Sequence, residues 1–275
     1  MYLALTVCFG WIFALCVHEF CHAVVAYIGG DKSVKEKGYL SLNPLKYTDP
    51  GLTLVVPIVM LMIGGIALPG AAVYINRNAL RNKFWHSAVS AAGPLGSAIM
   101  IFVYALPFML HVHFSDELAW LYPALALLVL LQIVAFFLNS LPIPPLDGYG
   151  VIEPFLPRPM RTAMDQFGRY GIWIVFGLLW FVPPLNNALW DTSMIVADQL
   201  NVPYHGIKIG YAMFSQQKYY LVMVLIVIMM LSRFGKKDAP APNSHPPQKT
   251  DETPEEIVES MRAQFPLSSE KKSGL

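Results

Sequence analysis

The N-terminal part of the chain contains an almost unbroken apolar run, residues 3–28, that is long enough to cross a lipid bilayer as one helix. The whole chain is 55% hydrophobic and only 13% charged, with a mean hydropathy of +0.49. A soluble globular domain carries about twice that share of charged residues. Further apolar stretches cover residues 52–73, 88–110, 118–138, 171–190 and 219–232. The sequence therefore predicts an all-α polytopic membrane protein.

Three polar side chains interrupt the first apolar run, in the pattern His18-Glu19-Phe20-Cys21-His22. A charged group at the bilayer centre costs roughly 2.5–3.5 kcal/mol, so these side chains need partners or water. On a helix, His18 and His22 lie one above the other, about 40° apart, and both imidazoles can bind one metal ion. Glu19 lies on the flank of this pair, within reach of a water molecule on the metal. The alternative is a chance match, in which the histidines only form hydrogen bonds with a neighbouring helix.

A catalytic zinc site needs a third protein ligand, and the segment 139–148 is its best source in this sequence. Prolines 142, 144 and 145 prevent a helix here, and the free backbone groups are tolerated at membrane depth only beside a cavity or other protein. Asp147 emerges from this segment, and Gly148 permits a tight turn. Asp147 is the predicted third ligand, and the alternative is a solvated aspartate in a loop that ends a helix.

Together the two motifs resemble those of the site-2 protease family of intramembrane zinc metalloproteases. The matching residues are His18-Glu19-x-x-His22 and Asn139-x-x-Pro142-x-Pro144-x-Leu146-Asp147-Gly148, and the resemblance covers roughly residues 1–150. It implies that His18, His22 and Asp147 bind Zn²⁺ and that Glu19 is the catalytic base.

A third element, Ala92-Gly93-Pro94, is similar to the A-G-P-x-x-N element of the same family. This chain carries Ser97 where the family usually has Asn, so the resemblance implies no role for that side chain. Some family members carry a CBS or PDZ domain, and we expect a bacterial-type member without either.

The distribution of Lys and Arg predicts the topology. Cytoplasmic loops are rich in these residues. His22 and Asp147 each lie at the C-terminal end of an apolar run, and ligands of one ion share one depth, so both helices must run towards the cytoplasm. If residues 52–73 crossed the membrane fully, His22 and Asp147 would approach opposite faces, so this segment must be a re-entrant hairpin. With the hairpin, all of the 19 basic residues except Lys208 and Lys218 lie on one side of the membrane. We expect five transmembrane helices plus the hairpin, with the active site near the cytoplasmic face.

Two smaller features have both a functional and an ordinary interpretation. Residues 71–75 form a predicted short strand that could pair with an unwound substrate, or they are a plain surface loop. Asn139 is a candidate catalytic residue that stabilises the oxyanion, or it caps the end of a helix.

The sequence divides into three parts: a metalloprotease membrane core over residues 1–150, additional transmembrane helices over 151–232 and a disordered cytoplasmic tail over 233–275. We expect a multi-pass protein of the cell membrane whose partners are a transmembrane protein substrate and membrane lipid. The net charge of +1 gives no indication of nucleic-acid binding.

The predicted function is hydrolysis of peptide bonds in membrane-embedded proteins, by zinc-activated water with Glu19 as general base. One alternative is a membrane metal-ion transporter that binds ions in transit. A second is an inactive protease-like protein that binds membrane proteins without cutting them. Polar groups concentrated at one end of the apolar helices favour the protease over the transporter, and the intact Glu19 argues against the inactive protein.

Overall fold

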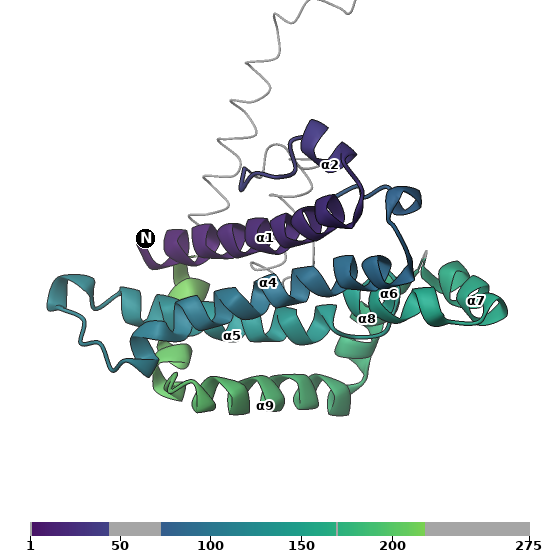
Figure 1. Cartoon of the computed structure of the whole chain (residues 1–275). Coiled ribbons are helices and arrows are strands. Elements are labelled where there is room, and N and C mark those ends of the chain that lie inside the picture. Colours follow the sequence, from purple (N-terminus) through teal and green to yellow (C-terminus); the bar gives the residue numbers. More distant parts are fainter. Residues whose placement is uncertain (1, 44–72, 169, 218–275) are drawn as a thin grey trace, which may run out of the picture. The chain divides into compact units, whose positions relative to one another are not determined.

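The computed structural model describes residues 2–43, 73–168 and 170–217, and the structural statements below concern these residues (Figure 1). They are helical apart from short connections, and no strand is assigned within these three ranges, which confirms the predicted all-α class. The elements are α1 (Tyr2–Gly29), α2 (Ser33–Glu36), η2 (Arg77–Ala79), α4 (Lys83–Met109), η3 (Asp116–Leu118), α5 (Leu121–Asn139), α6 (Asp147–Ile152), η4 (Glu153–Phe155), α7 (Arg158–Gly168), α8 (Gly171–Phe181), α9 (Pro183–Gln199) and a helix over 204–217.

Three stretches of helix are long and apolar enough to cross a membrane: Tyr2–Gly29, Lys83–Met109 and Asp116–Asn139. They match three of the predicted crossings. The predicted hairpin over 52–73, except for Val73, and the predicted crossing over 219–232 lie outside the described residues. The number of five crossings therefore stays a prediction.

The predicted crossing over residues 171–190 is not one straight helix. The chain bends by 90° between α8 and α9, and the two helices qualify as a span only when they are taken together. Val182 lies at the bend in a non-helical conformation, and two prolines follow it. Proline cannot continue a preceding helix but fits the first turn of a new one, so this sequence ends α8 and starts α9 at once.

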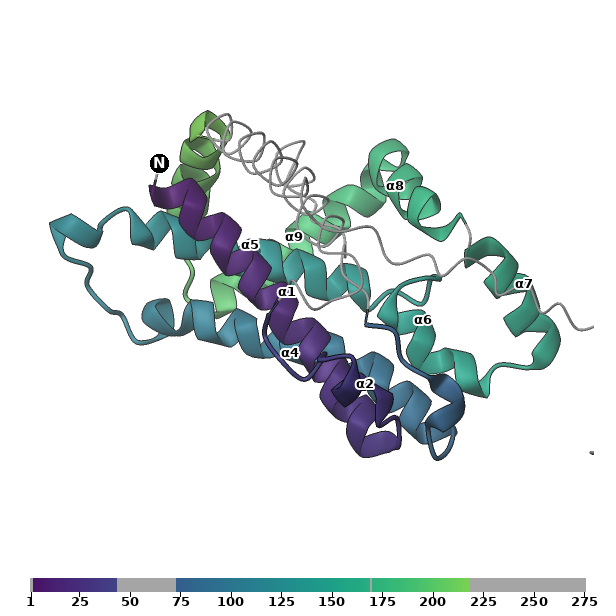
Figure 2. The same cartoon turned by 90° about the horizontal axis from the view of Figure 1, so that it is seen from above.

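The long helices pack into one bundle. α4 contacts both α1 and α5, α1 also contacts α5, and α9 covers another side of α5. Viewed from above, α1 lies over α4 and α5 (Figure 2). A glycine permits the close approach of α1 to α5, because a Cβ atom added at Gly10 would lie 2.6 Å from Cδ1 of Leu128. Apolar residues of both helices form the first core cluster, including Leu3, Val7, Trp11 and Leu131.

The outer face of α4 is apolar although it is exposed. Six large apolar side chains on this helix are each more than half exposed: Phe84, Leu95, Ile99, Phe102, Val103 and Leu106. Contiguous exposed apolar surface of this kind is rare on a soluble monomer and is the normal surface of a helix in lipid. The polar residues of α1 have the opposite placement, since His18, Glu19 and His22 are all buried inside the bundle. The fold is that of a membrane protein.

The predicted short strand over residues 71–75 is not supported. Residues 71 and 72 lie outside the described ranges, and residues 73–75 carry no strand assignment. A strand needs a partner for its backbone groups. The described partners of residues 73 and 74 are side chains instead, because the Val73 N–H donates to Glu19 and the Tyr74 carbonyl accepts from Lys37.

Candidate metal centre

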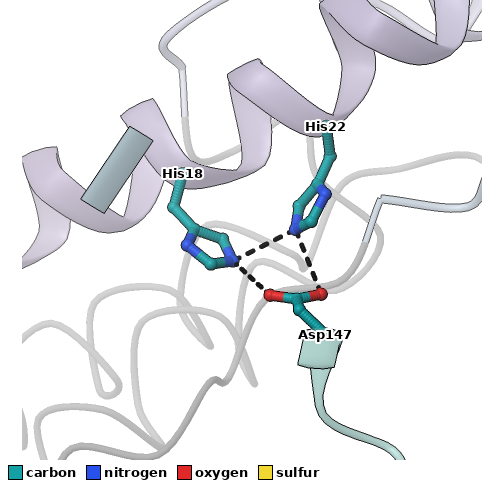
Figure 3. Close-up of side chains that lie close together, drawn as sticks. All are labelled: His18, His22 and Asp147. Carbon is teal, nitrogen blue, oxygen red and sulfur yellow. Dashed lines mark hydrogen bonds and ion pairs between the residues drawn. The ribbon is translucent and has the colours of Figure 1, made fainter. Parts of the chain in front are cut away.

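Two histidines and a glutamate of α1 face the interior of the bundle. His18 and His22 lie one helical turn apart, so their imidazoles project from the same face of α1 (Figure 3). Their exposed fractions are 4% and 7%, and that of Glu19 between them is 3%. Three such groups inside an apolar helix are stabilised only by specific partners, and these come from α4, α6 and the chain before η2.

Asp147 approaches the two histidines from a different part of the chain. The proline-rich residues after α5 turn the chain back, and α6 begins at Asp147. The turn is tight, because a Cβ atom added at Gly148 would lie 2.2 Å from the Ser140 carbonyl oxygen at the end of α5. This close approach requires glycine at position 148 and aims the Asp147 carboxylate at α1, as Figure 3 shows.

The ligand atoms of these three residues converge on one point. Nε2 of His18 lies 3.1 Å from Nε2 of His22 and 3.1 Å from Oδ2 of Asp147. Nε2 of His22 lies 3.3 Å from Oδ1 of Asp147. One potential ligand atom from each residue lies within 4.8 Å of the other two. Among the described residues, these three side chains form the group that could hold a metal ion.

Hydrogen bonds from α4 fix which ring nitrogens face the centre. Nδ1 of His22 lies 2.6 Å from the carbonyl oxygen of Val89, which can only accept, so Nδ1 carries the proton. Nδ1 of His18 lies 2.9 Å from Oγ of Ser97, which can accept in the same way. The His22 tautomer leaves its Nε2 with a lone pair for a metal, and the Ser97 contact holds the His18 ring with its Nε2 facing the same point, as in known sites where the second ring nitrogen is held by an outer partner.

Ser97 has a role that its sequence context left open. It stands where the resembling family usually has Asn. In the structure its hydroxyl is buried and bonded to His18, so it orients one of the candidate ligands. The Val89 carbonyl was not recognised either, because no side-chain pattern marks a backbone acceptor.

The donor set fits zinc. Zinc prefers four-coordinate sites of nitrogen and oxygen ligands at about 2.0–2.1 Å, which places neighbouring ligand atoms roughly 3.3 Å apart. The three separations of 3.1, 3.1 and 3.3 Å agree with that spacing. Three lone-pair donors packed so closely repel one another unless a cation or protons lie between them. Burial raises the pKa of the Asp147 carboxyl, but the two imidazoles lower it by more, so the site favours the carboxylate.

A glycine of α4 closes the third side of the centre. A Cβ atom added at Gly93 would lie 2.2 Å from Nε2 of His22 and 2.5 Å from Nε2 of His18. The backbone of α4 therefore lies directly against the ligand atoms. The sequence element Ala92-Gly93-Pro94 belongs to this contact.

Glu19 faces a cavity of about 420 Å³ beside the centre. Its Oε2 accepts a hydrogen bond of 3.1 Å from the backbone N–H of Val73. The cavity is lined by the three candidate ligands and by Glu19, Val73, Tyr74, Ile75, Arg77, Leu80, His86, Val89, Ser90, Asn139, Pro145 and Leu146. A buried carboxylate at the wall of a cavity next to three converging ligand atoms has the placement of a general base.

Asn139 belongs to the same cavity. It is the last residue of α5, with an exposed fraction of 7%, and the C-cap of that helix is Ser140. His86 also lines the cavity. The structure therefore gathers every residue that the sequence singled out for the site around one cavity.

Comparison with known proteins identifies relatives. The chain is 40% identical over 178 residues to "Putative zinc metalloprotease Rip2" of Mycolicibacterium smegmatis, an alignment that covers 65% of this chain and 67% of that protein. It is 38% identical over 179 residues to the protein of the same name in Mycobacterium tuberculosis, with the same coverage. It is 37% identical over 187 residues to "Putative zinc metalloprotease YwhC" of Bacillus subtilis, covering 65% of this chain and 81% of that protein.

No protein-family model and no solved structure matches the chain. The relatives therefore carry the assignment, and their names agree with the His-His-Asp centre. The chain belongs to the site-2 protease family and is a zinc metalloprotease by its relatives.

Proposed function

We propose that this protein is an intramembrane endopeptidase that hydrolyses peptide bonds of membrane-embedded protein substrates. One observation carries the proposal: Glu19 faces a cavity beside the converging ligand atoms of His18, His22 and Asp147, on a helix long and apolar enough to span a membrane. A buried carboxylate next to a metal centre supports hydrolysis, because it can move protons during the reaction.

In this proposal His18, His22 and Asp147 hold Zn²⁺, which when bound polarises the scissile carbonyl and lowers the pKa of water to about 7. Glu19 accepts a proton from the attacking water and later delivers it to the leaving amine. The Val73 N–H donates to Oε2 of Glu19 and so helps to orient the carboxylate. Asn139, at the cavity wall, is a candidate donor to the developing oxyanion.

The cavity beside the centre can supply the water that hydrolysis needs. The imidazoles and Glu19 are almost fully buried, whereas the Asp147 side chain is 21% exposed. The cavity has a polar wall that includes His86, Ser90 and Asn139. Such a wall can hold the water that the reaction consumes, while the apolar outer faces of the helices remain in lipid.

The proposed orientation in the membrane rests on the charges at the two ends of the bundle. Near the centre, the described basic residues lie after α1, between η2 and the start of α4, and in α7. Two of them donate to carbonyls at the end of α1, Arg81 to Ile28 and Lys32 to Tyr27. The loop over residues 111–117, at the opposite end of α4 in Figure 1, has no Lys or Arg. The positive-inside rule supports a multi-pass protein with its centre towards the cytoplasm.

The test of the proposal is cleavage of a co-reconstituted transmembrane reporter by the full chain in proteoliposomes. Glu19→Gln should retain stoichiometric zinc and lose cleavage by at least about 10²-fold, because the metal ligands stay while the proton acceptor is removed. Glu36→Gln, which changes an exposed glutamate of α2, should cleave like the wild type. Zinc flux across sealed vesicles without cleavage would identify a transporter, and reporter binding without cleavage by the zinc-loaded wild type would identify an inactive relative.

The orientation has a separate test. Single cysteines at Lys35 and Ser115, in a chain whose native cysteines are replaced, should react differently with a membrane-impermeant thiol reagent on intact cells. The loop cysteine at position 115 should be labelled and that at position 35 protected. The opposite labelling would place the centre on the outer side.

A further inference from the structure

Residues 73–77, which we call the strap, run past the catalytic cavity and contact it from one side. Val73, Tyr74, Ile75 and Arg77 line the cavity together with Glu19. The N–H of Val73 donates to Oε2 of Glu19 over 3.1 Å. The position of the strap therefore sets the direction of that N–H. The strap is in turn held by its attachments to the rest of the protein.

The first attachment is a buried aspartate. Asp31, with an exposed fraction of 1%, follows the end of α1, and its Oδ2 accepts a hydrogen bond of 2.7 Å from the Asn76 N–H. Its Oδ1 accepts from the backbone N–H of Ser33 at 3.0 Å and from the hydroxyl of Ser33 at 2.7 Å. Hydrogen bonds to a buried carboxylate are charge-assisted and stronger than neutral ones, so Asp31 fixes the middle of the strap to the helix that carries Glu19.

The second attachment is an ion pair between Arg77 and Glu153. The Glu153 carboxylate has an exposed fraction of 4% and lies between the guanidinium groups of Arg77 and Arg161. Glu153 begins η4, directly after α6, the helix that starts at Asp147. Arg77 thus fixes the end of the strap to the segment that supplies the third candidate ligand.

Arg161 contacts the same carboxylate from α7. The two arginines are alike in exposure, with 51% of the Arg77 side chain and 46% of the Arg161 side chain exposed. The two arginines differ in their position in the fold, since Arg77 belongs to the strap and Arg161 belongs to α7. This difference makes Arg161 a matched control.

We propose that Arg77 and Asp31 are positioning residues of the protease, which hold the strap through Glu153 and Asn76 so that the Val73 N–H orients the Glu19 carboxylate. The inference rests on the proposed function, because it concerns the group that moves the proton. It adds residues that neither sequence motif contains. A displacement of about 1 Å at a reacting group can lower a rate by 10²-fold, so loss of one attachment should be visible in the turnover.

The first experiment compares Arg77→Gln with Arg161→Gln in the full chain, using cleavage of the transmembrane reporter. Arg77→Gln should lower kcat roughly ten-fold with KM within about two-fold, because the carboxylate is misplaced while the substrate site remains. Arg161→Gln should retain kcat within about three-fold. Zinc content and thermal unfolding are measured for both variants, so that only folded, metal-loaded protein is compared. Equal losses in the two variants overturn the inference.

The second experiment tests whether Arg77 acts through the strap. Val73→Pro deletes the N–H that reaches Glu19, so in this background the position of the strap no longer affects that hydrogen bond. Arg77→Gln should then lower kcat by less than about two-fold, in contrast to its effect in the wild type. An arginine that only stabilises the fold would give the same loss in both backgrounds, and that result overturns the inference.

Asp31→Asn weakens the other attachment, because it removes the charge and one of the two acceptor oxygens, and it supplies an independent variant if Arg77→Gln does not fold with zinc. It should lower kcat in the same direction, and its effect should also disappear in the Val73→Pro background. A wild-type chain that fails to cleave would remove the proposed function and this inference with it. A wild-type chain that cleaves, with Arg77→Gln and Asp31→Asn equally active, removes only the inference.

Discussion

Gly93 of α4 lies directly against His22 of α1, so closely that a Cβ atom at Gly93 would be 2.2 Å from the Nε2 atom of the imidazole. Real Cβ atoms do not approach other heavy atoms to this distance, so the contact excludes any side chain at position 93. Because Nε2 is a candidate metal-ligating atom, the packing of two helices and the geometry of the metal centre depend on one another.

Gly93→Ala should therefore lose zinc and activity together. The added methyl group would push both imidazoles away from Asp147, and we expect zinc affinity to fall by at least about ten-fold. Gly177→Ala on α8 is the matched control, since a Cβ atom there meets nothing within 4 Å. The measurement is metal content of the purified variants by elemental analysis. A zinc-loaded, active Gly93→Ala protein would show that the helices can separate without harm to the centre.

Ser97→Ala should weaken zinc binding while the fold remains. The substitution removes the partner of His18 Nδ1 and leaves that ring free to rotate. Loss of such an outer partner typically lowers metal affinity by about 10–100-fold. Ser193→Ala deletes a buried hydroxyl that donates to the Leu189 carbonyl of its own helix, and zinc affinity should not change. Competition with a chromogenic chelator measures both variants, and equal affinities would show that Ser97 does not orient the ring.

Asp147→Asn should lose zinc, in contrast to Glu19→Gln. The amide keeps the shape of the side chain but removes the negative charge that the two imidazoles stabilise, so zinc affinity should fall by at least about ten-fold. Asp198→Asn, at an exposed position of α9, should bind zinc like the wild type. Elemental analysis after dialysis against a weak chelator separates these outcomes. Full zinc occupancy in Asp147→Asn would mean that the third ligand is another residue.

Removal of the metal should both stop cleavage and lower the thermal stability of the protein. A ligand that binds only the folded state stabilises it by about 2.7 kcal/mol when its free concentration is one hundred times the Kd. Chelation should thus lower the Tm, and added zinc should restore the Tm and the cleavage together. His22→Ala provides the control, because its Tm should not respond to zinc. A Tm that is independent of zinc in the wild type would contradict a site formed by two distant parts of the chain, α1 and the start of α6.

Local sequence was sufficient to predict that His18 and His22 act together in the metal centre. The spacing of His18 and His22 by four residues places both rings on one face of any α-helix, whatever surrounds it. The apolar runs predicted the three long helices for a similar reason, since bilayer thickness and helix rise fix the length that such a run must have. Prolines 142, 144 and 145 likewise end α5 without any help from tertiary contacts.

Two other expectations differ from the structure, one because of tertiary partners and one because of local breaks in the helix. Residues 73–75 have the β-branched composition of a strand, but side chains satisfy the backbone of Val73 and Tyr74, so no strand is assigned there. The predicted crossing over 171–190 is broken at Val182, where the prolines that follow start a second helix at a sharp angle. An apolar composition does not distinguish a straight helix from a bent pair.

The sequence by itself determined that the chain is helical, that three of its stretches can span a membrane and that two histidines share one helical face. Only the tertiary structure decided which backbone carbonyl and which hydroxyl hold the rings, that α4 comes close enough to require Gly93, and that Arg77 meets Glu153 beside the cavity. The physical reason is the range of the interactions. Helix periodicity and proline act over a few residues, whereas a hydrogen bond between segments about seventy residues apart exists only after the helices have packed.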